Sequence, residues 1–268
     1  MPSAQKANIM NKDRLLVRYD KDLRLRVMYP EARREVTGDV VRFIRKAPGM
    51  NFISFTFATE PRLERVIDSE LDYFTPMNQP FTWKVYDHDR LPGLKTKLEA
   101  RNFIPDDDPA AVMALDVNEA PERLFQPAEA DIRRIAVPER LEDVIAVLDE
   151  VYGGHNAWVN DRLGMHLKIP GYLSVYAAYA DDKPVSIAWT YFPGGRFATL
   201  FGGTTLAAYR GRGLYTGLLF TRLREIRARG YPFAIVEAGP MSKPIVEKHG
   251  FKHLTTVWDY EWNEWKRN

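Results

Sequence analysis

The sequence has no cysteine among its 268 residues, so disulfides, thiolate metal sites and a cysteine nucleophile are excluded. It also lacks an excess of charge of one sign, because 38 basic residues face 36 acidic ones and the net charge is +2. A nucleic-acid-binding protein normally carries a clear basic excess. No apolar run reaches transmembrane length, and residues 1–14 have no signal-peptide apolar region. We therefore expect a cytoplasmic protein that binds neither nucleic acid nor membrane.

The chain is long enough for one large domain or two small ones. Hydrophobic residues make up 45% and aromatic residues 12% of it, enough for a sizeable core. The stretch 121–130, rich in proline, glutamate and alanine, favours a linker. We therefore predict a first domain over residues 1–120 and a second over residues 127–268.

Hydrophobic periodicity predicts most elements of the first half. Residues 13–37 mix charge with short apolar runs and favour one or two strands or a linker, and the ordered chain is expected to begin near Met10. Beyond them we expect strands over 52–57, 82–86 and 111–117, and helices over 61–74 and 94–101, the second ended by a left-handed Asn102.

The second half shows a clearer order of elements. We expect two helices, a hairpin that turns at residues 181–183, a strand, a long helix, and then strand, helix and strand. The expected ranges are 138–151, 157–167, 172–180, 184–192, 197–205, 214–229, 233–237, 242–249 and 255–262.

The stretch between the strand at 197–205 and the helix at 214–229 contains Arg210, Gly211, Arg212 and Gly213. Glycines let a backbone turn tightly and approach a ligand closely. The first amides of a helix have no partner within it and carry the positive end of its dipole. This arrangement suits an anion such as a pyrophosphate, although a plain tight turn would have the same composition.

Two common nucleotide-binding motifs do not fit this loop. The Rossmann fingerprint matches Gly211 and Gly213, and Glu237 ends the next strand, but Thr216 stands where the third glycine is required. The Walker A pattern fails because no Gly-Lys-Ser/Thr follows at the right spacing.

The loop resembles the Arg-x-x-Gly-x-(Gly/Ala) motif of the GCN5-related N-acetyltransferases. Arg210 and Gly213 match it, whereas Tyr215 stands where Gly or Ala is usual. The order of elements over 127–268 and the segment 242–251, which ends in Gly-Phe, are also similar to that family. The resemblance implies an α/β (α+β) fold with a mixed, mostly antiparallel sheet flanked by helices. The first half is similar to a degenerate copy without the loop, so the resemblance implies a tandem protein.

The resemblance further implies that acetyl-CoA is the co-substrate and that the acetyl group passes directly to a primary amine. The strand end Thr204, Thr205 and Leu206 would pair with the pantetheine arm. The pyrophosphate would be bound by the loop residues Arg210, Gly211, Arg212, Gly213, Leu214, Tyr215 and Thr216, with Ser242 as a further contact.

The catalytic residues are less clear from the resemblance. The family's usual tyrosine acid is replaced by Val246, and the asparagine that often begins this segment is replaced by Gly239. The remaining candidates are Glu237 as a base, Ser242 beside the thiolate, and Tyr215 as a nearby hydroxyl. The simpler interpretation of Glu237 is a solvated strand-end carboxylate, and that of Ser242 is an N-cap.

Two alternative functions remain consistent with the sequence. A non-catalytic acyl-CoA sensor would keep the loop and lose the acid and base, and an NAD-binding oxidoreductase would need a parallel sheet. Asp87-His88-Asp89 is not expected to bind a metal, since three consecutive residues rarely converge on one ion. The acceptor is expected to be a small molecule if the first half closes over its pocket, and the tryptophan-rich strand 255–262 could pair across a homodimer.

Overall fold

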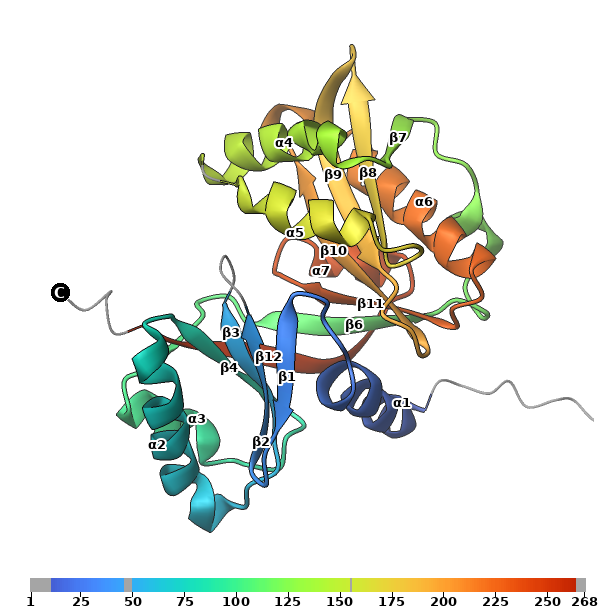
Figure 1. The fold of residues 1–268 in the computed structure, drawn as a ribbon. Coiled ribbons are helices and arrows are strands. Elements are labelled where there is room, and N and C mark those ends of the chain that lie inside the picture. The colour runs from blue at the N-terminus through green and yellow to red at the C-terminus, as the bar shows by residue number, and fades with distance from the viewer. Residues whose placement is uncertain (1–10, 46–49, 155, 264–268) are drawn as a thin grey trace, which may run out of the picture.

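The computed structural model describes residues 11–45, 50–154 and 156–263. Within these ranges one mixed sheet of 12 strands runs through the molecule in the order β1-β2-β3-β4-β12-β6-β11-β10-β9-β8-β7, with β5 beside β12 (Figure 1). The strands are β1 Ala32–Val36, β2 Val40–Arg45, β3 Asn51–Thr56, β4 Phe81–Tyr86, β5 Ile104–Pro105, β6 Ala110–Asp116, β7 Asp131–Ile135, β8 Leu173–Ala180, β9 Lys183–Tyr191, β10 Phe197–Thr205, β11 Phe233–Ala238 and β12 Lys252–Trp262.

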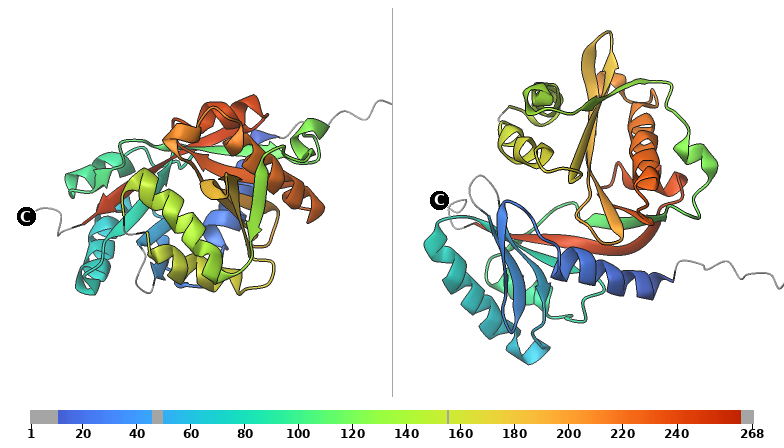
Figure 2. Two further views of the ribbon diagram at one scale, coloured as in Figure 1. Left: turned by 90° about the horizontal axis from the view of Figure 1, so that it is seen from above. Right: turned by 45° about the vertical axis from the view of Figure 1, so that its right-hand side comes forward.

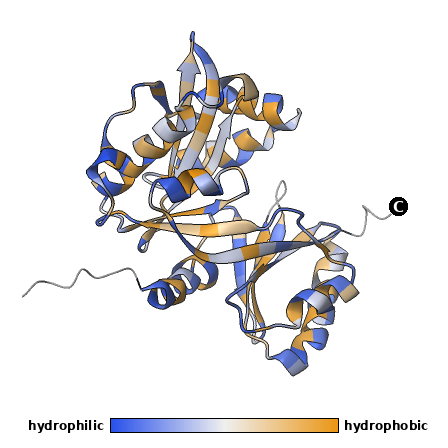
Figure 3. Cartoon of the chain, turned by 180° about the vertical axis from the view of Figure 1, so that it is seen from behind, coloured by the Kyte–Doolittle hydropathy of each residue, from blue (hydrophilic) through white to orange (hydrophobic). Residues whose placement is uncertain are grey.

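Helices pack against the sheet in both halves of the chain. In the later half, α4 and α5 lie on one side of β8–β10 and α6 on the other (Figure 2), while α2 and α3 cover the earlier half. The central strands are largely apolar, and the helices alternate apolar and hydrophilic residues around their axes (Figure 3). The helices are α1 Lys12–Tyr19, α2 Leu63–Phe74, α3 Leu94–Ala100, α4 Glu142–Tyr152, α5 Trp158–Leu167, α6 Leu214–Ala228 and α7 Lys243–Lys248.

The two halves of the chain exchange their last strands. β3 and β4 are parallel and joined by α2, and β10 and β11 are parallel and joined by α6. The strand that follows each pair then joins the other half: β6 pairs with β11, and β12 pairs with β4. β6 and β12 lie antiparallel to each other at the centre. The halves therefore share one continuous sheet, and the division of the chain between residues 120 and 127 stays a prediction.

Most sequence-predicted elements are present. β10 has the predicted bounds, and α6 begins at Leu214 as expected. The hairpin turn has positive φ at Asp181 and Asp182, and Asn102 adopts the left-handed conformation expected after α3. The fold class is confirmed, since the sheet is mixed, mostly antiparallel and flanked by helices. Strands β2 and β7 were not predicted. Met10, the expected start of the ordered chain, lies outside the described residues.

The expectation of strands or a linker over 13–37 is wrong for its first part. Residues 12–19 form α1, which Asn11 caps by accepting a hydrogen bond from the Arg14 amide at 3.0 Å. A π-helical turn, Asp20–Leu25, follows before β1. α1 forms because Leu15, Leu16 and Tyr19 share one helical face and pack onto the centre of the sheet.

Two other expectations need correction. The stretch 121–130 is not a free linker, because Leu124 and Phe125 lie in a short 3₁₀ turn and are buried in the core that also contains α6. The last strand is not available for pairing across a dimer, since β12 has β4 on one side and β6 on the other.

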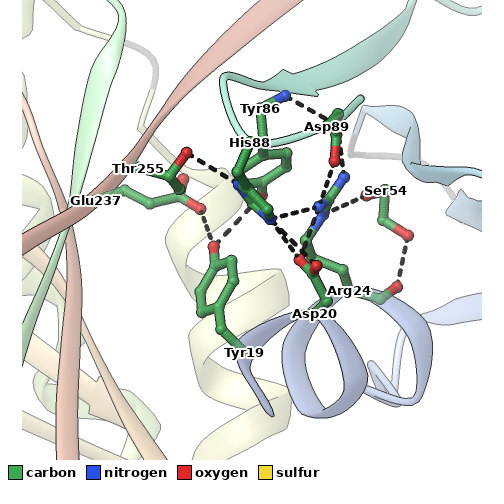
Figure 4. A network of polar contacts seen from close by, with 9 residues as sticks. All are labelled: Tyr19, Asp20, Arg24, Ser54, Tyr86, His88, Asp89, Glu237 and Thr255. Atoms are coloured by element: carbon green, nitrogen blue, oxygen red, sulfur yellow. Dashed lines mark hydrogen bonds and ion pairs between the residues drawn. The ribbon is translucent and has the colours of Figure 1, made fainter. Parts of the chain in front are cut away.

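A buried arginine ties the N-terminal segment to the first half (Figure 4). Arg24 is 1% exposed and pairs with Asp20 at 2.7 Å and Asp89 at 2.8 Å. Its Nε donates to the Ser54 carbonyl, and its guanidinium lies 3.8 Å from the ring centre of Tyr86. Burial alone would raise the pKa of Asp20, but hydrogen bonds from His88 and attraction by Arg24 outweigh it and lower that pKa. The network thus fixes the π-helical turn against β3 and β4.

We predict that Arg24→Met lowers the free energy of unfolding at pH 7 by about 3 kcal/mol, because it leaves Asp20 and Asp89 without their buried partner. The lowered pKa of Asp20 means that its stabilising contribution is present above its ordinary pKa of 3.8 and is lost as the pH falls through the folded-state value. The difference from wild type should therefore shrink at pH 3. Urea unfolding at both pH values measures it.

Arg26→Met is the matched control, because Arg26 is an exposed arginine two residues further along the same segment. It should change stability by less than about 0.5 kcal/mol. Equal effects of the two substitutions would contradict the role given to Arg24.

Candidate functional site

The two parallel strands β10 and β11 part midway along their length. They pair from Phe197 and Phe233 as far as Leu200 and Val236. Beyond that point β10 continues only against β9, and β11 only against β6. The two strands therefore enclose an opening. Along its edges, the backbone groups of β10 and β11 that face the opening have no strand to pair with.

A β-bulge explains why β10 turns away. Its register with β9 shifts between Phe201 and Thr204, across Gly202 and Gly203. Gly202 has φ +63, and a Cβ there would lie 2.0 Å from the ring of Trp189. A Cβ on Gly203 would lie 2.7 Å from the ring of Tyr215. Two consecutive glycines are thus required for two aromatic rings to pack against the bulge.

The arginine–glycine loop follows β10 directly. Gly211 and Gly213 have φ of +74 and +78, and Gly213 is the N-cap of α6. The amide of Gly217 donates to the Gly213 carbonyl at 2.8 Å, whereas the amides of residues 211–216 have no acceptor within the described part of the chain. Arg210 holds the loop to β10 by donating to the Thr205 carbonyl at 3.2 Å. The loop therefore presents a row of free amides at a helix N-terminus, as an anion site requires.

A cavity of about 200 Å³ lies beside the opening, on the side of this loop and α7. Thr204, Tyr215, Glu237 and Ser242 line it together with Val246. Burial raises the pKa of the Tyr215 phenol, and the nearby Arg222 guanidinium and Ser242 hydroxyl partly oppose that rise. The structure thus brings the three candidate catalytic residues to one cavity.

Ser242 and the other predicted cofactor-binding residues differ in which of their atoms are free. Ser242 occupies the N-cap position of α7 but makes no capping bond with its side chain, which donates to the Gly239 carbonyl at 3.2 Å. The side chains of Leu206 and Leu214 are buried in the core, so only their backbone could reach a ligand. The hydroxyl of Thr205 hydrogen-bonds to Ser186 at 2.7 Å. Arg212 and Thr216 lie at the loop and the first turn of α6, with Arg212 exposed.

A larger cavity, of about 420 Å³, lies on the opposite side of the opening and is lined by both halves of the chain. The two cavities share four residues, Leu200, Phe201, Val236 and Glu237. They therefore meet where β10 and β11 part.

Glu237 stands at this junction and is held by residues of the first half. Its carboxylate pairs with Lys84 at 3.3 Å and accepts a hydrogen bond from Tyr19 at 3.4 Å (Figure 4 shows the Tyr19 contact). Lys84 also pairs with Asp259 at 3.0 Å. Burial alone would lower the pKa of Lys84, but attraction by Glu237 and Asp259 raises it well above its ordinary value. Burial likewise raises the pKa of Tyr19. Glu237 is thus a paired carboxylate at a cavity junction.

The Asp87-His88-Asp89 run points to three separate partners. Asp87 pairs with Lys95 at 2.9 Å, His88 contacts Asp20, and Asp89 pairs with Arg24. Across the described ranges no group of three or more histidine, aspartate or glutamate residues is placed to hold a metal ion.

No helix within the described ranges is both long and apolar enough to cross a membrane.

No local sequence pattern marks Tyr19, Lys84, Tyr86 and Asp259 as site residues. Each comes from the first half or from β12 and reaches the site only through the exchange of strands. Trp189 and Tyr191 line the larger cavity, whereas Trp258 packs beside Lys95 outside it.

Comparisons with known proteins agree with this geometry. Residues 118–239 match the family model described as "Acetyltransferase (GNAT) domain". No curated protein sequence matches the chain.

Solved structures with the same fold cover nearly the whole chain. A GCN5-related N-acetyltransferase from Kribbella flavida aligns over 93% of each chain with 14% identity and a TM-score of 0.65. A functionally unknown conserved protein from Staphylococcus epidermidis aligns over 88% of this chain and 96% of its own, with 12% identity and a TM-score of 0.66. A tandem GNAT protein from the clavulanic acid biosynthesis pathway aligns over 89% and 85%, with 13% identity and a TM-score of 0.56.

These structural similarities establish the fold, and the family match covers the loop and both strands that part around the opening. Residues 118–239 therefore match a GNAT acetyltransferase domain, and this match and the shared fold support an acyltransferase.

Proposed function

We propose that the protein transfers an acetyl group from acetyl-CoA directly to the primary amine of a small molecule. The observation that carries this proposal is the opening between β10 and β11, because a cavity beside the arginine–glycine loop and a larger cavity between the two halves are both lined by the residues at which these strands part. A donor on one side and an acceptor on the other would meet there without leaving the protein. Such a protein would act in the cytoplasm.

The donor fits the side of the opening that faces the loop. Its pyrophosphate would accept hydrogen bonds from the free amides of residues 211–216. Its pantetheine arm would run along the free edge of β10 beyond Leu200, like an added strand. The thioester would then lie at the end of this edge, beside Val236 and Glu237. Holding both reactants at one opening supplies the proximity on which direct transfer depends.

The proton movements can be assigned to the groups around the junction. As the amine nitrogen forms its bond to the acetyl carbon, Glu237 accepts a proton from it, directly or through one water. The carbon–sulfur bond then breaks, and the departing thiolate receives a proton from the Tyr215 phenol. The raised pKa of Tyr215 keeps that proton in place at neutral pH, and Ser242 lines the same cavity beside the phenol. Tyr215 on α6 faces the same cavity as Val246, so it can supply the acid that α7 lacks.

We predict that Gly213→Asp weakens acetyl-CoA binding at least about tenfold, because a carboxylate at the helix N-terminus repels the pyrophosphate and occupies its approach. Nothing lies within 4 Å of a Cβ at Gly213, so the variant should fold. Titration calorimetry with acetyl-CoA measures the change, and circular dichroism checks the fold.

Gly194→Asp provides the control for this test. Gly194 also has a positive φ, +86, and open space around its Cβ, but it lies in the turn before β10. Both variants carry the same backbone strain and the same added charge. If they lose affinity equally, or if folded wild type does not bind acetyl-CoA, the placement of the cofactor is wrong.

We predict that Glu237→Gln lowers kcat for acetyl transfer by about a hundredfold or more and leaves acetyl-CoA affinity unchanged, because the amide keeps the shape but accepts no proton. Thiol release with a panel of small primary amines measures transfer. Asp259→Asn removes the other carboxylate that pairs with Lys84, and should reduce kcat much less.

Similar losses of kcat in both variants would mean that Glu237 acts only as an ion-pair partner of Lys84. Tight binding of acetyl-CoA without thiol release for any amine would instead favour a non-catalytic acyl-CoA sensor.

A further inference from the structure

The larger cavity has two polar ends that are separated by aromatic side chains. One end is the junction, with Lys84, Glu237 and Asp259. The other is lined by Glu31, Arg45, Arg162 and His166, from β2 and the segment before β1 in the first half and from α5 in the second. Tyr29 also lines the cavity: burial raises its pKa to about 12, and charges from both ends, Arg45 with Glu31 and Lys84 with Glu237, act on it. Both ends therefore border one cavity.

The charges at the far end do not balance. Glu31 is the acidic residue there, and its carboxylate is already shared by Arg45 at 3.1 Å and His166 at 3.0 Å. Arg162 makes no ion pair with any described residue, and its Nε is buried without an acceptor. The Nε of Arg45 is also buried without an acceptor. One guanidinium therefore faces the cavity without a counter-charge.

The surroundings of Arg162 disfavour its positive charge. Burial lowers its pKa, and repulsion by Arg45 lowers it further, with only partial opposition from Glu31. Buried charges in proteins are normally paired. A guanidinium is a planar fork that matches a carboxylate with two parallel hydrogen bonds. A carboxylate from a ligand would thus supply both the missing charge and the missing acceptors.

The cavity walls match a small organic molecule. Trp158, Tyr172, Trp189 and Tyr191 line it from the second half and Phe52 from the first. Its volume of about 420 Å³ lies in the range of small-molecule sites, which are mostly apolar with a few polar groups that fix orientation. Arg162 itself lies over the ring of Trp158, 5.0 Å from its centre, and this packing keeps the guanidinium in place.

We propose that the acceptor is a small amino carboxylate, whose carboxylate binds Arg162 at the far end of the cavity while its amine lies at Glu237. This inference rests on the proposed function, because it assumes that the larger cavity receives the amine. Arg162 acts as a specificity-determining residue and takes no part in the transfer of the acetyl group. Its loss should therefore affect KM for carboxylated amines far more than kcat.

The test compares amines that differ only in this group. The acids are 4-(aminomethyl)benzoate and a series of ω-amino carboxylates from glycine to 6-aminohexanoate. Each acid is compared with its own carboxamide. Calorimetry measures their binding without acetyl-CoA, and thiol release measures their turnover. Wild type should bind the best carboxylate at least about tenfold more tightly than its amide. Arg162→Gln should abolish this preference without lowering stability, since it removes an unpaired charge.

Lys168→Gln is the matched control, because it removes the same charge from the exposed end of α5. It should keep the preference for the carboxylate. Equal binding of acid and amide by wild type, a preference that survives in Arg162→Gln, or no binding of any carboxylate would each overturn the inference.

The two proposals fail in different ways. Arg162-dependent binding of a carboxylate with no thiol release would contradict the proposed transfer and support the carboxylate site. If amino carboxylates and their carboxamides are acetylated at equal rates, and these rates are unchanged in Arg162→Gln, the result would support the transfer and contradict the carboxylate site.

Discussion

The separation of β10 from β11 is the constraint on which the rest of the site depends. Parallel strands normally stay paired to their ends, and here the pairing stops at Leu200 and Val236. The cause is local, because Trp189 packs where a side chain on Gly202 would be, and β10 bends with β9. One bulge thus produces the free strand edge, the opening that both cavities border and the position of the loop before α6.

The first half of the chain completes the site from the other side. Because β12 returns to pair with β4, Lys84 and Asp259 lie next to each other and beside Glu237. The Arg24 network holds the π-helical turn and, through Tyr19, reaches the same carboxylate (Figure 4). The GNAT domain alone would therefore lack one wall of the larger cavity. The larger cavity is therefore lined by both halves of the chain.

Local sequence patterns predicted the part of the site that is built locally. The strand, loop and helix from 197 to 229 follow one another in the chain, so glycine positions and helical periodicity were sufficient to predict them. α1 was missed because its short apolar runs have no clear period, and its helix is stabilised by the sheet it covers. The larger cavity could not be predicted, since Glu31 and His166 are brought together only by the shared sheet. Arg162 likewise carries no local signal. It lacks a counter-charge because the Glu31 carboxylate is already shared by Arg45 and His166.

The most direct test of the central claim is a crystal structure of the protein with coenzyme A bound. The account predicts that the pyrophosphate contacts the amides of residues 211–216, that the pantetheine arm lies along the free edge of β10, and that the sulfur lies at the opening beside Val236 and Glu237. Coenzyme A bound with its sulfur away from this opening, or pantetheine outside the gap between β10 and β11, would contradict it.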